Sequence, residues 1–575
     1  MISTHKMDIL QKTKSFDKRS IADHLREPKD FALILNGKTE FSINKPSCCG
    51  EYLSSAVEFL RVTLNKIAGS EIFFYSSHSE RTISFQILED DKEIKYDGFC
   101  IEAQKNKISF LALSQRGAAN GIYRFLEDYL GCMFVRPDYD YIPQCDTVYL
   151  YEGKKISNPD FRWRRFYQYE LSQNNWYRKL LSNGTDDTLW GNSCHTVFDY
   201  VNPDIYFEKH PEYFSLYNGE RTKDQLCLCN EDIYPIISES ADKMIKCKPE
   251  AVYWDFSIND NLHGCQCEKC RAISEKYGGF APTLLILNKL AKEHPDKIFS
   301  TLAYFFSAEP PRSIPCEKNI NVKLAPISSG QKYAFAFSAN KKAADTNKLI
   351  SDWSEVISDL YLWDYVVNFK HALLPYPNFD VQRDNLRFYK QHNVTHIFHQ
   401  GCRDKGAELA CLRSYIMSRQ LWDIEVDTDS LIAKYLCVTY GAAAPYLAQY
   451  LQLMHDILSQ EADDLDLYDN PKDHASDYLS TGAIEKYRQL IDEAFKAEKD
   501  DKAIISRLEE IKINVLYAQI NDVNASKEDI KKYIDEIKPL IEKHQIDRYN
   551  EWNKPALKDL YEQNDRAIKF RDTAL

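Results

Sequence analysis

Strand and helix signals alternate along the middle of this chain, and this alternation constrains the fold more than any other feature. Eight short apolar runs are candidate strands, and most are separated by segments with apolar residues at helical spacing. These runs are FYQYEL, LWGNSCH, DQLCLCN, AVYWDFSIND, FSTLAYFF, NVKLAPISS, LYLWDYVVNF and THIFHQG. Eight such units over about 270 residues match the size of a (β/α)8 barrel. We therefore predict an α/β fold with a TIM-type barrel at residues 160–430.

A doubly wound open sheet is the competing α/β fold. It predicts a glycine-rich phosphate-binding loop after the first strand. No such loop follows FYQYEL. The sequence therefore favours the barrel over the open sheet.

The regions on either side of the predicted barrel have different patterns. Residues 1–30 are polar and predict a poorly ordered lead-in. Residues 31–150 combine two helical patterns with about five strand-like runs, which predicts a small α+β domain. Residues 431–575 carry apolar residues at helical spacing and many opposite charges four residues apart, which predicts a helical C-terminal region. The last of these helical patterns covers residues 553–568.

The composition limits the partners and the compartment. The net charge of −13 argues against nucleic acid and anionic membranes as partners. No apolar run is long enough for a transmembrane helix, and the N-terminal residues lack the apolar core of a signal peptide. We therefore expect a cytoplasmic protein, or a periplasmic or secreted one if a leader has been removed. The aromatic content of 13% suggests a site for ligands with flat apolar faces.

Candidate site residues are found where the predicted strands end, because the active groups of a barrel lie at the carboxyl ends of its strands. The candidates for substrate binding are His195, Asn259, Tyr304, Trp363, Tyr365, Asn368, His399 and Gln400. Their amides and imidazoles can hydrogen-bond sugar hydroxyls, and their rings can cover the C–H face of a sugar. The set therefore favours carbohydrate chemistry.

Three carboxyl groups are candidates for catalysis. Glycoside hydrolysis needs one carboxylic acid to protonate the leaving oxygen and a second group to stabilise or attack the anomeric centre. Asp260 and Asp364 follow the fourth and seventh predicted strands, and Glu170 follows the first. The competing interpretation of each is a helix cap or loop carboxylate at a strand-to-helix junction.

The segment HGCQCEKC at 263–270 is the pattern most typical of a metal site. Cys265, Cys267 and Cys270 are close enough in sequence to ligate one structural Zn²⁺. The fourth ligand would come from His263, Cys227 or Cys229. A disulfide plus a free thiol, or plain reduced thiols, fit the same pattern. We therefore expect no cofactor and no catalytic metal, and keep a structural zinc ion as the alternative.

Several long motifs resemble the barrel of the domain-of-unknown-function 4838 family, part of which is classified as glycoside hydrolase family 163. The motifs are NSCHT, HPEYFSLYNGER, QLCLCN, SINDN, CQCEKC, LYLWDYVVNFKHALLPYPNF, HQG and GAELACLRSYIMSRQLWD. They occur in order over about residues 160–455. The segment 31–150, which ends RGAANGIYRFLEDYLGCMFVRP, resembles the small domain that precedes the barrel in α-glucuronidases and family 20 hexosaminidases.

The resemblance implies an endo-β-N-acetylglucosaminidase that acts on N-glycans with retention assisted by the substrate. One carboxylic acid then protonates the leaving oxygen, and a second carboxylate orients the 2-acetamido group that attacks the anomeric carbon. Related barrels commonly have two acids at the end of the fourth strand, whereas this chain has Asn259 and Asp260 there. The second acid must then come from elsewhere, with Asp364 or Glu170 as candidates. Many relatives also have an acid where this chain has His399.

The sequence therefore predicts a glycoside hydrolase of the N-acetylhexosaminidase type, with a glycan or glycoconjugate as its partner. One alternative is a uronic-acid glycosidase, which needs a cation to pair with the substrate carboxylate. Arg165 and Arg403 keep that alternative open. The other alternative is a glycan-binding protein without catalysis. For such a protein we expect only one usable carboxylate.

Overall fold

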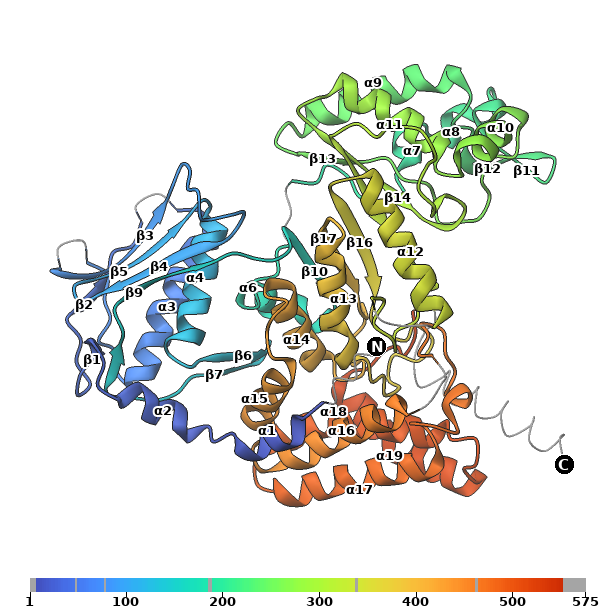
Figure 1. Cartoon of the computed structure of the whole chain (residues 1–575). Helices are drawn as coiled ribbons and strands as arrows, with labels where there is room; N and C mark the ends of the chain where they lie inside the picture. Colours follow the sequence, from blue (N-terminus) through green and yellow to red (C-terminus); the bar gives the residue numbers. More distant parts are fainter. Residues whose placement is uncertain are drawn as a thin grey trace. The chain divides into compact units, whose positions relative to one another are not determined.

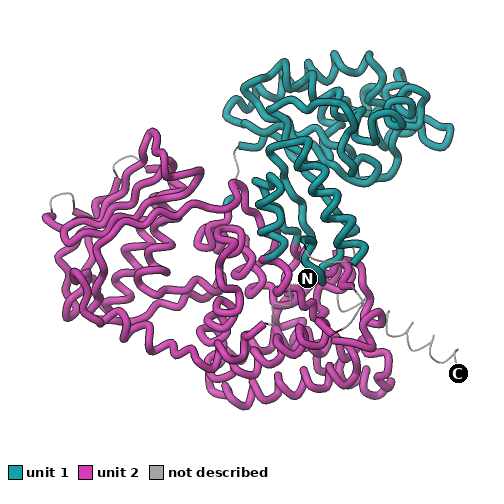
Figure 2. The backbone as a smooth tube through the Cα atoms, in the orientation of Figure 1, with its two compact units in different colours: residues 1–3, 183–365, 384–400 teal, residues 4–182, 366–383, 401–575 magenta. Residues whose placement is uncertain are grey.

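The computed structural model folds into two compact units (Figure 2). Unit 1 is built from segments 183–365 and 384–400, and unit 2 from segments 4–182, 366–383 and 401–575. The structure describes residues 7–46, 49–76, 79–184, 189–336, 340–460 and 464–551. The helix predicted at 553–568 lies outside these residues.

A parallel half-barrel sheet forms the centre of unit 1, and the chain has an α/β fold (Figure 1). Its strands lie side by side in the order β17-β16-β15-β14-β13. They are β13 (Tyr253–Asp255), β14 (Ile298–Ala303), β15 (Ile320–Leu324), β16 (Leu360–Tyr365) and β17 (Val394–Gln400). The last five predicted strands coincide with them. The register places Asp364 beside His399 and Trp363 beside Phe398.

Helices connect and cover these strands. They are α7 (Val197–Tyr200), α8 (Pro203–Tyr206), α9 (Tyr234–Cys247), α10 (Glu268–Tyr277), α11 (Ala281–Glu293), α12 (Lys341–Val356) and α13 (Phe379–Gln391). α12 begins where the Asn340 side chain accepts hydrogen bonds from two backbone amides of the first turn. Its buried Trp353 packs edge-on against Phe280 and donates to the Ala308 carbonyl at 2.7 Å. The helix is thereby fixed against its neighbours.

Two of the eight predicted strands take another form. LWGNSCH contributes one isolated bridge, between Trp190 and Tyr253, because Cys194 and His195 have φ angles of 67° and 54° and cannot extend a strand. DQLCLCN overlaps β12 (Glu220–Leu226), which pairs antiparallel with β11 (Phe214–Tyr217) instead of joining the parallel sheet. The turn Asn218-Gly219, with both φ angles positive, favours this hairpin.

The half-barrel sheet has two faces because successive side chains of a strand point to opposite sides. On one face, Lys323 reaches Asp255 and also faces the Tyr361 ring. We call this the inner face. The side chains that lie on it include Asp255, Lys323, Tyr361, Trp363, His396, Phe398 and Gln400. On the other face, Asp364 accepts a hydrogen bond from Tyr389 of α13 at 3.1 Å. We call this the helix face.

The N-terminal part of unit 2 is an α+β layer (Figure 1). Its five-stranded sheet has the order β2-β3-β5-β4-β9, and its other strands form separate pairs. The strands are β1 (Phe31–Ile34), β2 (Phe41–Ile43), β3 (Arg81–Ile87), β4 (Phe99–Gln104), β5 (Lys107–Ala112), β6 (Met133–Arg136), β7 (Tyr139–Tyr141), β8 (Val148–Leu150) and β9 (Gly153–Ser157). Helices α3 (Glu51–Ala68) and α4 (Gln115–Asp128) pack on this layer. α3 ends at Gly69 with φ 73°, the left-handed conformation that favours glycine.

The rest of unit 2 is mainly helical. Its elements are β10 (Trp163–Tyr167), α5 (Tyr169–Ser172), α6 (Trp176–Lys179), α14 (Ala410–Trp422), α15 (Thr428–Tyr440), α16 (Ala444–Ser459), α17 (Thr481–Ala497), α18 (Lys502–Ile520) and α19 (Lys527–His544). The first predicted strand overlaps β10. A core that includes Leu458, Leu516 and Ile537 joins α16, α18 and α19. None of the described helices has the length and apolar content that crossing a bilayer requires.

The segment predicted as a poorly ordered lead-in instead forms α1 (Ile9–Ser15) and α2 (Arg19–Arg26). The backbone amide of Asp8 donates to the Asp429 carboxylate at 2.8 Å, and Lys12 pairs with Asp427 at 2.5 Å. The polar composition of this segment hid these contacts because their partners come from α15 and the residue that caps it, more than 400 positions away in the chain.

A buried ion pair crosses the inner face. The Nζ of Lys323 on β15 lies 2.7 Å from the Asp255 carboxylate on β13, and both side chains are almost fully buried. The ammonium group also faces the ring of Trp190 at 4.4 Å. A buried charge that loses its partner is expensive to keep, so this pair fixes the packing between the two strands.

We expect Lys323→Met to lower the free energy of unfolding by about 3–5 kcal/mol, because removal of one partner leaves Asp255 in a dry site without its cation. Urea denaturation measures this change. Lys318→Met, at an exposed position just before β15, is the matched control and should stay within about 0.5 kcal/mol of the wild type. A loss in Lys323→Met as small as that of the control would contradict the assignment.

Candidate functional site

Side chains from adjacent strands meet at the carboxyl end of the half-barrel. Tyr304 follows β14, Ile327 follows β15, and Trp363 lies near the end of β16; Cys194 packs with them. We call Cys194, Tyr304, Ile327 and Trp363 the edge cluster. Trp363 is only partly buried, so part of its ring is accessible. The edge cluster therefore combines an aromatic surface with the strand ends where barrel enzymes bind substrate.

Gln400 gives the edge cluster a polar neighbour. The indole Nε1 of Trp363 donates a hydrogen bond to Oε1 of Gln400 at 2.6 Å. Phe398 packs edge-on against the same indole at 4.7 Å. These contacts fix the Trp363 ring and leave the amide NH₂ of Gln400 as a potential donor to a ligand.

The loop before α7 is held against the end of β13 in a strained conformation. Both Cys194 and His195 lie in the left-handed region, which is costly for residues with a side chain and is concentrated at functional sites. The Asp255 carboxylate accepts from the backbone N–H of Cys194 at 3.1 Å and from the hydroxyl of Thr196 at 2.8 Å. The network of the buried ion pair therefore also fixes this loop.

His195 has a defined tautomer. Its Nδ1 lies 2.7 Å from the carbonyl oxygen of Ile258, which can only accept a hydrogen bond, so Nδ1 carries the proton. The backbone N–H of His195 donates to Ser257 Oγ at 2.8 Å. In the neutral imidazole, Nε2 is then an acceptor, suited to a sugar hydroxyl.

Asp260 lies in a loop that is tied to β12. Gln225 accepts from the Asn259 backbone N–H at 3.0 Å and donates to the Asn259 carbonyl at 2.8 Å. The side chains of Asn259 and Asn261 both donate to the Asp224 carbonyl, at 2.8 and 3.1 Å.

The residues on both sides of Asp260 are therefore anchored, while Asp260 itself is exposed. Burial raises the pKa of the Cys194 thiol, and the charge of Asp260 adds a smaller contribution in the same direction. An anchored backbone limits the positions that the Asp260 carboxyl can reach, as the positioning of a functional group requires.

A second carboxylate, that of Asp224, belongs to the same network. The sequence did not predict it. Oδ2 of Asp224 lies 2.8 Å from Nδ1 of His263, whose ring stacks on Tyr217 at 4.3 Å. The hydrogen bond with His263 lowers the pKa of Asp224 below its usual value, so its carboxylate stays ionised. The hairpin turn Asn218-Gly219 was the available signal, because it indicates that β12 pairs with β11 outside the parallel sheet.

The structure places Asp364 and His399 away from the edge cluster. Both lie on the helix face, are almost fully buried, and approach each other at 3.4 Å. Burial raises the pKa of Asp364 to about 7 and lowers that of His399 to about 3. The two groups therefore stay close to net neutral under α13, on the side of the sheet opposite Trp363 and Gln400.

The remaining predicted residues divide between the units. Tyr365 is buried at the end of β16 in unit 1. Glu170 and Asn368 belong to unit 2 and are also buried. Glu170 accepts from Gln168 at 2.8 Å and from the Gly406 amide at 3.0 Å, and burial raises the pKa of its carboxyl.

The side-chain amide of Asn368 forms three hydrogen bonds. It donates to the Asp469 carbonyl and accepts from the amides of Lys370 and His371. Its hydrogen bonds therefore support the backbone of unit 2.

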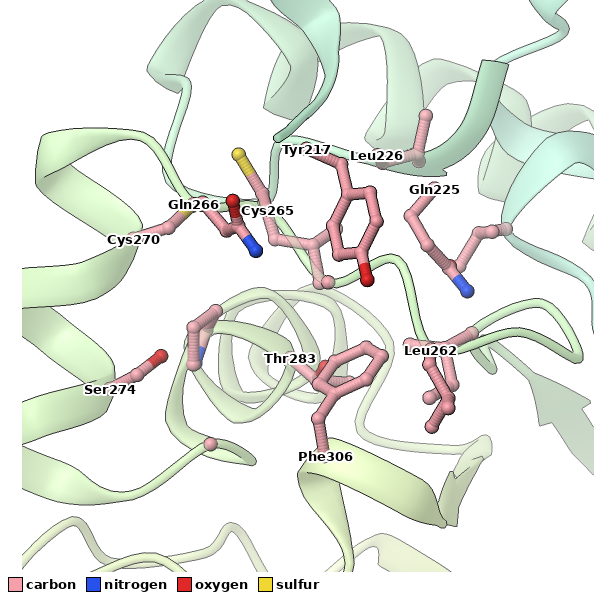
Figure 3. A pocket seen from close by; sticks show the side chains of 16 residues that line it. Tyr217, Gln225, Leu226, Leu262, Cys265, Gln266, Cys270, Ser274, Thr283 and Phe306 are labelled. Carbon is pink, nitrogen blue, oxygen red and sulfur yellow. The ribbon is translucent and has the colours of Figure 1, made fainter. Parts of the chain in front are cut away.

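An apolar cavity of about 260 Å³ adjoins the anchored loop (Figure 3). Tyr217, Gln225 and Leu262 line it on one side, and Phe306 and Thr283 on another. Leu262 and Phe306 are exposed large apolar side chains. The cavity can therefore accommodate an apolar group or the C–H face of a sugar unit beside the network of Asp224 and Asp260.

Comparison with known proteins identifies the family. Residues 134–452 match the model of the family described as domain of unknown function (DUF4838), and the chain belongs to this family. This confirms the resemblance inferred from the motifs. No curated protein matches the chain.

The structural neighbours are glycoside hydrolases. A family 115 4-O-methyl-α-glucuronidase with specificity for decorated arabinogalactans has 10% sequence identity and a TM-score of 0.57, with 90% of this chain and 77% of that chain covered. A family 138 enzyme that targets pectin rhamnogalacturonan II has 11% identity and a TM-score of 0.44, with 92% of each chain covered. The structure of CpGH84B has 12% identity and a TM-score of 0.43, with 90% of this chain and 94% of that chain covered. At 10% identity, the similarity to the family 115 enzyme shows a common fold.

The raised pKa of Asp364 predicts a pH dependence of stability. The folded pKa of about 7 lies above the usual 3.8, so the stabilising contribution is complete below about pH 4 and is lost as the pH rises through 7. We expect Asp364→Asn to lose less stability than the wild type between pH 5 and pH 8. Urea denaturation at both pH values measures the difference. His399 is present in both proteins, so its own effect on stability is common to the two pH profiles.

Asp352→Asn, at a position half-exposed on α12, is the control and should follow the wild type. Equal pH dependence in the wild type and in Asp364→Asn would show that Asp364 is ionised throughout this range.

Proposed function

We propose that this protein is a glycoside hydrolase that cleaves glycans containing N-acetylglucosamine at the carboxyl end of its half-barrel sheet. The observation that carries the proposal is Asp260 itself, an exposed carboxyl group whose neighbours Asn259 and Asn261 are anchored to β12 through Asp224 and Gln225. Membership of the DUF4838 family and the glycoside hydrolase fold support it.

The groups at the edge cluster suit a sugar that carries no charge. Trp363 and Tyr304 offer ring faces to the C–H surface of a pyranose, and such contacts bind without requiring charge on the ligand. The amide of Gln400 and Nε2 of His195 offer a donor and an acceptor for hydroxyl or acetamido groups. An acetamido group needs an apolar ring face for its methyl group and hydrogen-bonding partners for its amide, and the edge cluster with its neighbours offers both.

We assign the role of general acid to Asp260. Its carboxyl group protonates the glycosidic oxygen as the bond to the anomeric carbon breaks. The carbonyl oxygen of the 2-acetamido group attacks the anomeric carbon, and water then opens the resulting ring with Asp260 acting as the base. This sequence needs no nucleophile from the protein.

We assign the orienting carboxylate to Asp224, in place of Asp364 and Glu170. Asp224 stays ionised beside His263, and its carbonyl holds the residues on both sides of Asp260. An ionised carboxylate can accept the acetamido N–H and hold the carbonyl oxygen toward the anomeric carbon. Asp364 is buried on the helix face, and both carboxyl oxygens of Glu170 are engaged within unit 2.

A uronic-acid glycosidase is the second candidate, favoured by the fold shared with a 4-O-methyl-α-glucuronidase. Such an enzyme needs a cation for the substrate carboxylate. Arg403 already contacts Asp404 at 3.3 Å and the Glu551 carbonyl at 3.0 Å, and Arg165 lies over the Tyr167 ring. These engagements favour the N-acetylglucosamine substrate over the uronic acid.

We expect Asp260→Asn to lower turnover by at least about a hundredfold, the scale on which general acid catalysis acts. The measurement is release of products from N-glycans and glycopeptides, detected by mass spectrometry. Glu250→Gln, an exposed carboxyl group in the loop before β13, is the matched control and should keep wild-type turnover. Near-normal turnover by Asp260→Asn would rule out its role as general acid.

The substrate class can be tested with aryl glycosides that differ in one group. We expect the wild type to cleave aryl β-N-acetylglucosaminide and to leave aryl β-glucoside essentially uncleaved, because the glucoside lacks the acetamido nucleophile. An aryl glucuronide tests the second candidate. Cleavage of the glucuronide alone would replace the proposal with the uronic-acid glycosidase, and equal cleavage of the two β-glycosides would contradict substrate assistance.

A further inference from the structure

Four cysteine side chains come together at one point of unit 1. Cys227 directly follows β12, Cys265 and Cys267 lie in the loop before α10, and Cys270 is in the first turn of α10. Their sulfur atoms all lie within 4.8 Å of one another. We propose that these four thiolates bind one Zn²⁺ ion in a closed structural site.

The distances between the sulfur atoms fit a tetrahedral metal site. The Sγ of Cys227 lies 3.6 Å from that of Cys267 and 3.9 Å from that of Cys270. Four sulfur atoms bound to one zinc ion at about 2.3 Å lie about 3.8 Å apart. A disulfide requires about 2.05 Å, so these thiols are not paired with each other. The spacing therefore leaves room for an ion between them.

Backbone donors surround the sulfur atoms in the way that supports metal thiolates. The N–H of Leu216 donates to Sγ of Cys265 at 3.4 Å, and the N–H of Cys270 donates to Sγ of Cys267 at 3.5 Å. The guanidinium of Arg221 also interacts with Cys227, Cys265 and Cys267. Zinc with four thiolates has a net negative charge, and these donors and this cation stabilise it.

The structure selects the fourth ligand among the residues that the sequence left open. His263 is engaged by Asp224 at 2.8 Å. Cys229 interacts with Cys270 but is not one of the four mutually close thiols. Cys227 completes the set, and four thiolates leave no position for water or substrate. The ion is therefore structural.

The site would join parts of unit 1 that are separate in the chain. Zinc bound by Cys227, Cys265, Cys267 and Cys270 ties the hairpin of β11 and β12 to the start of α10. Cys265 and Cys270 also line the apolar cavity (Figure 3). Each thiol loses its proton on binding, so the stabilisation depends on metal and is lost when a chelator removes it.

The first test is the metal content of the full-length protein purified without added metal. We expect inductively coupled plasma mass spectrometry to find about one zinc per chain in the wild type. Cys227→Ser and Cys267→Ser should lose most of it. Cys229→Ser, adjacent to the site, and Cys247→Ser, exposed at the end of α9, are matched controls that should keep it.

The second test does not depend on whether the serine variants fold. X-ray absorption at the zinc edge of the wild type should show four sulfur neighbours at about 2.3 Å. Absence of metal, nitrogen or oxygen ligands, iron in place of zinc, a disulfide among the four cysteines, or retention of zinc by Cys227→Ser with loss in Cys229→Ser would each overturn the proposal. None of these readouts requires a turnover assay.

Discussion

The buried carboxylate of Asp255 is the interaction on which the organisation of unit 1 depends. It pairs with Lys323 two strands away and accepts hydrogen bonds from the Cys194 amide and the Thr196 hydroxyl. The hydroxyl of Ser257 also donates to it. One charge thus joins two strands of the sheet to the loop that carries His195. A hydrophobic residue at position 255 could fill the space but could not orient that loop, because the loop contacts are hydrogen bonds to the carboxylate.

The pleat of β16 separates two adjacent residues with different roles. Trp363 points to the inner face and bonds to Gln400, whereas Asp364 points to the helix face and bonds to Tyr389. A shift of one residue in register would exchange them. The aromatic residue is therefore available to a ligand, while the carboxyl group, with a pKa of about 7, belongs to the packing under α13.

Local sequence patterns were sufficient to predict the successive parallel strands of the half-barrel sheet. The apolar runs predicted β13 to β17. They failed where the outcome depends on partners distant in sequence. Asp8 and Lys12 order α1 through residues of α15 and its cap, and the strand predicted at LWGNSCH is interrupted by the strained Cys194 and His195.

The prediction of the candidate site was limited in the same way, because local patterns do not reveal contacts between residues distant in sequence. Strand-end position pointed to Tyr304, Trp363 and Gln400, which the structure brings together, because that rule depends only on chain direction. It could not decide which face of β16 would be accessible, and so it included Asp364. It also could not identify Asp224, which lies within a hairpin strand whose pairing depends on the turn at Asn218-Gly219.

The end of β12 physically connects the proposed catalytic loop with the proposed zinc site. Asp224 and Gln225 hold the loop that carries Asp260, and Cys227 lies only two residues further along the chain. A metal ion bound at Cys227 would restrict the end of β12 and, through it, the backbone on both sides of Asp260. The hydrogen bonds of Asp224 and Gln225 hold Asn259 and Asn261 on both sides of Asp260, and the proposed metal would reduce how far Asp224 and Gln225 can move. The proposed zinc site and the loop that carries Asp260 would in this way be held by the same end of β12.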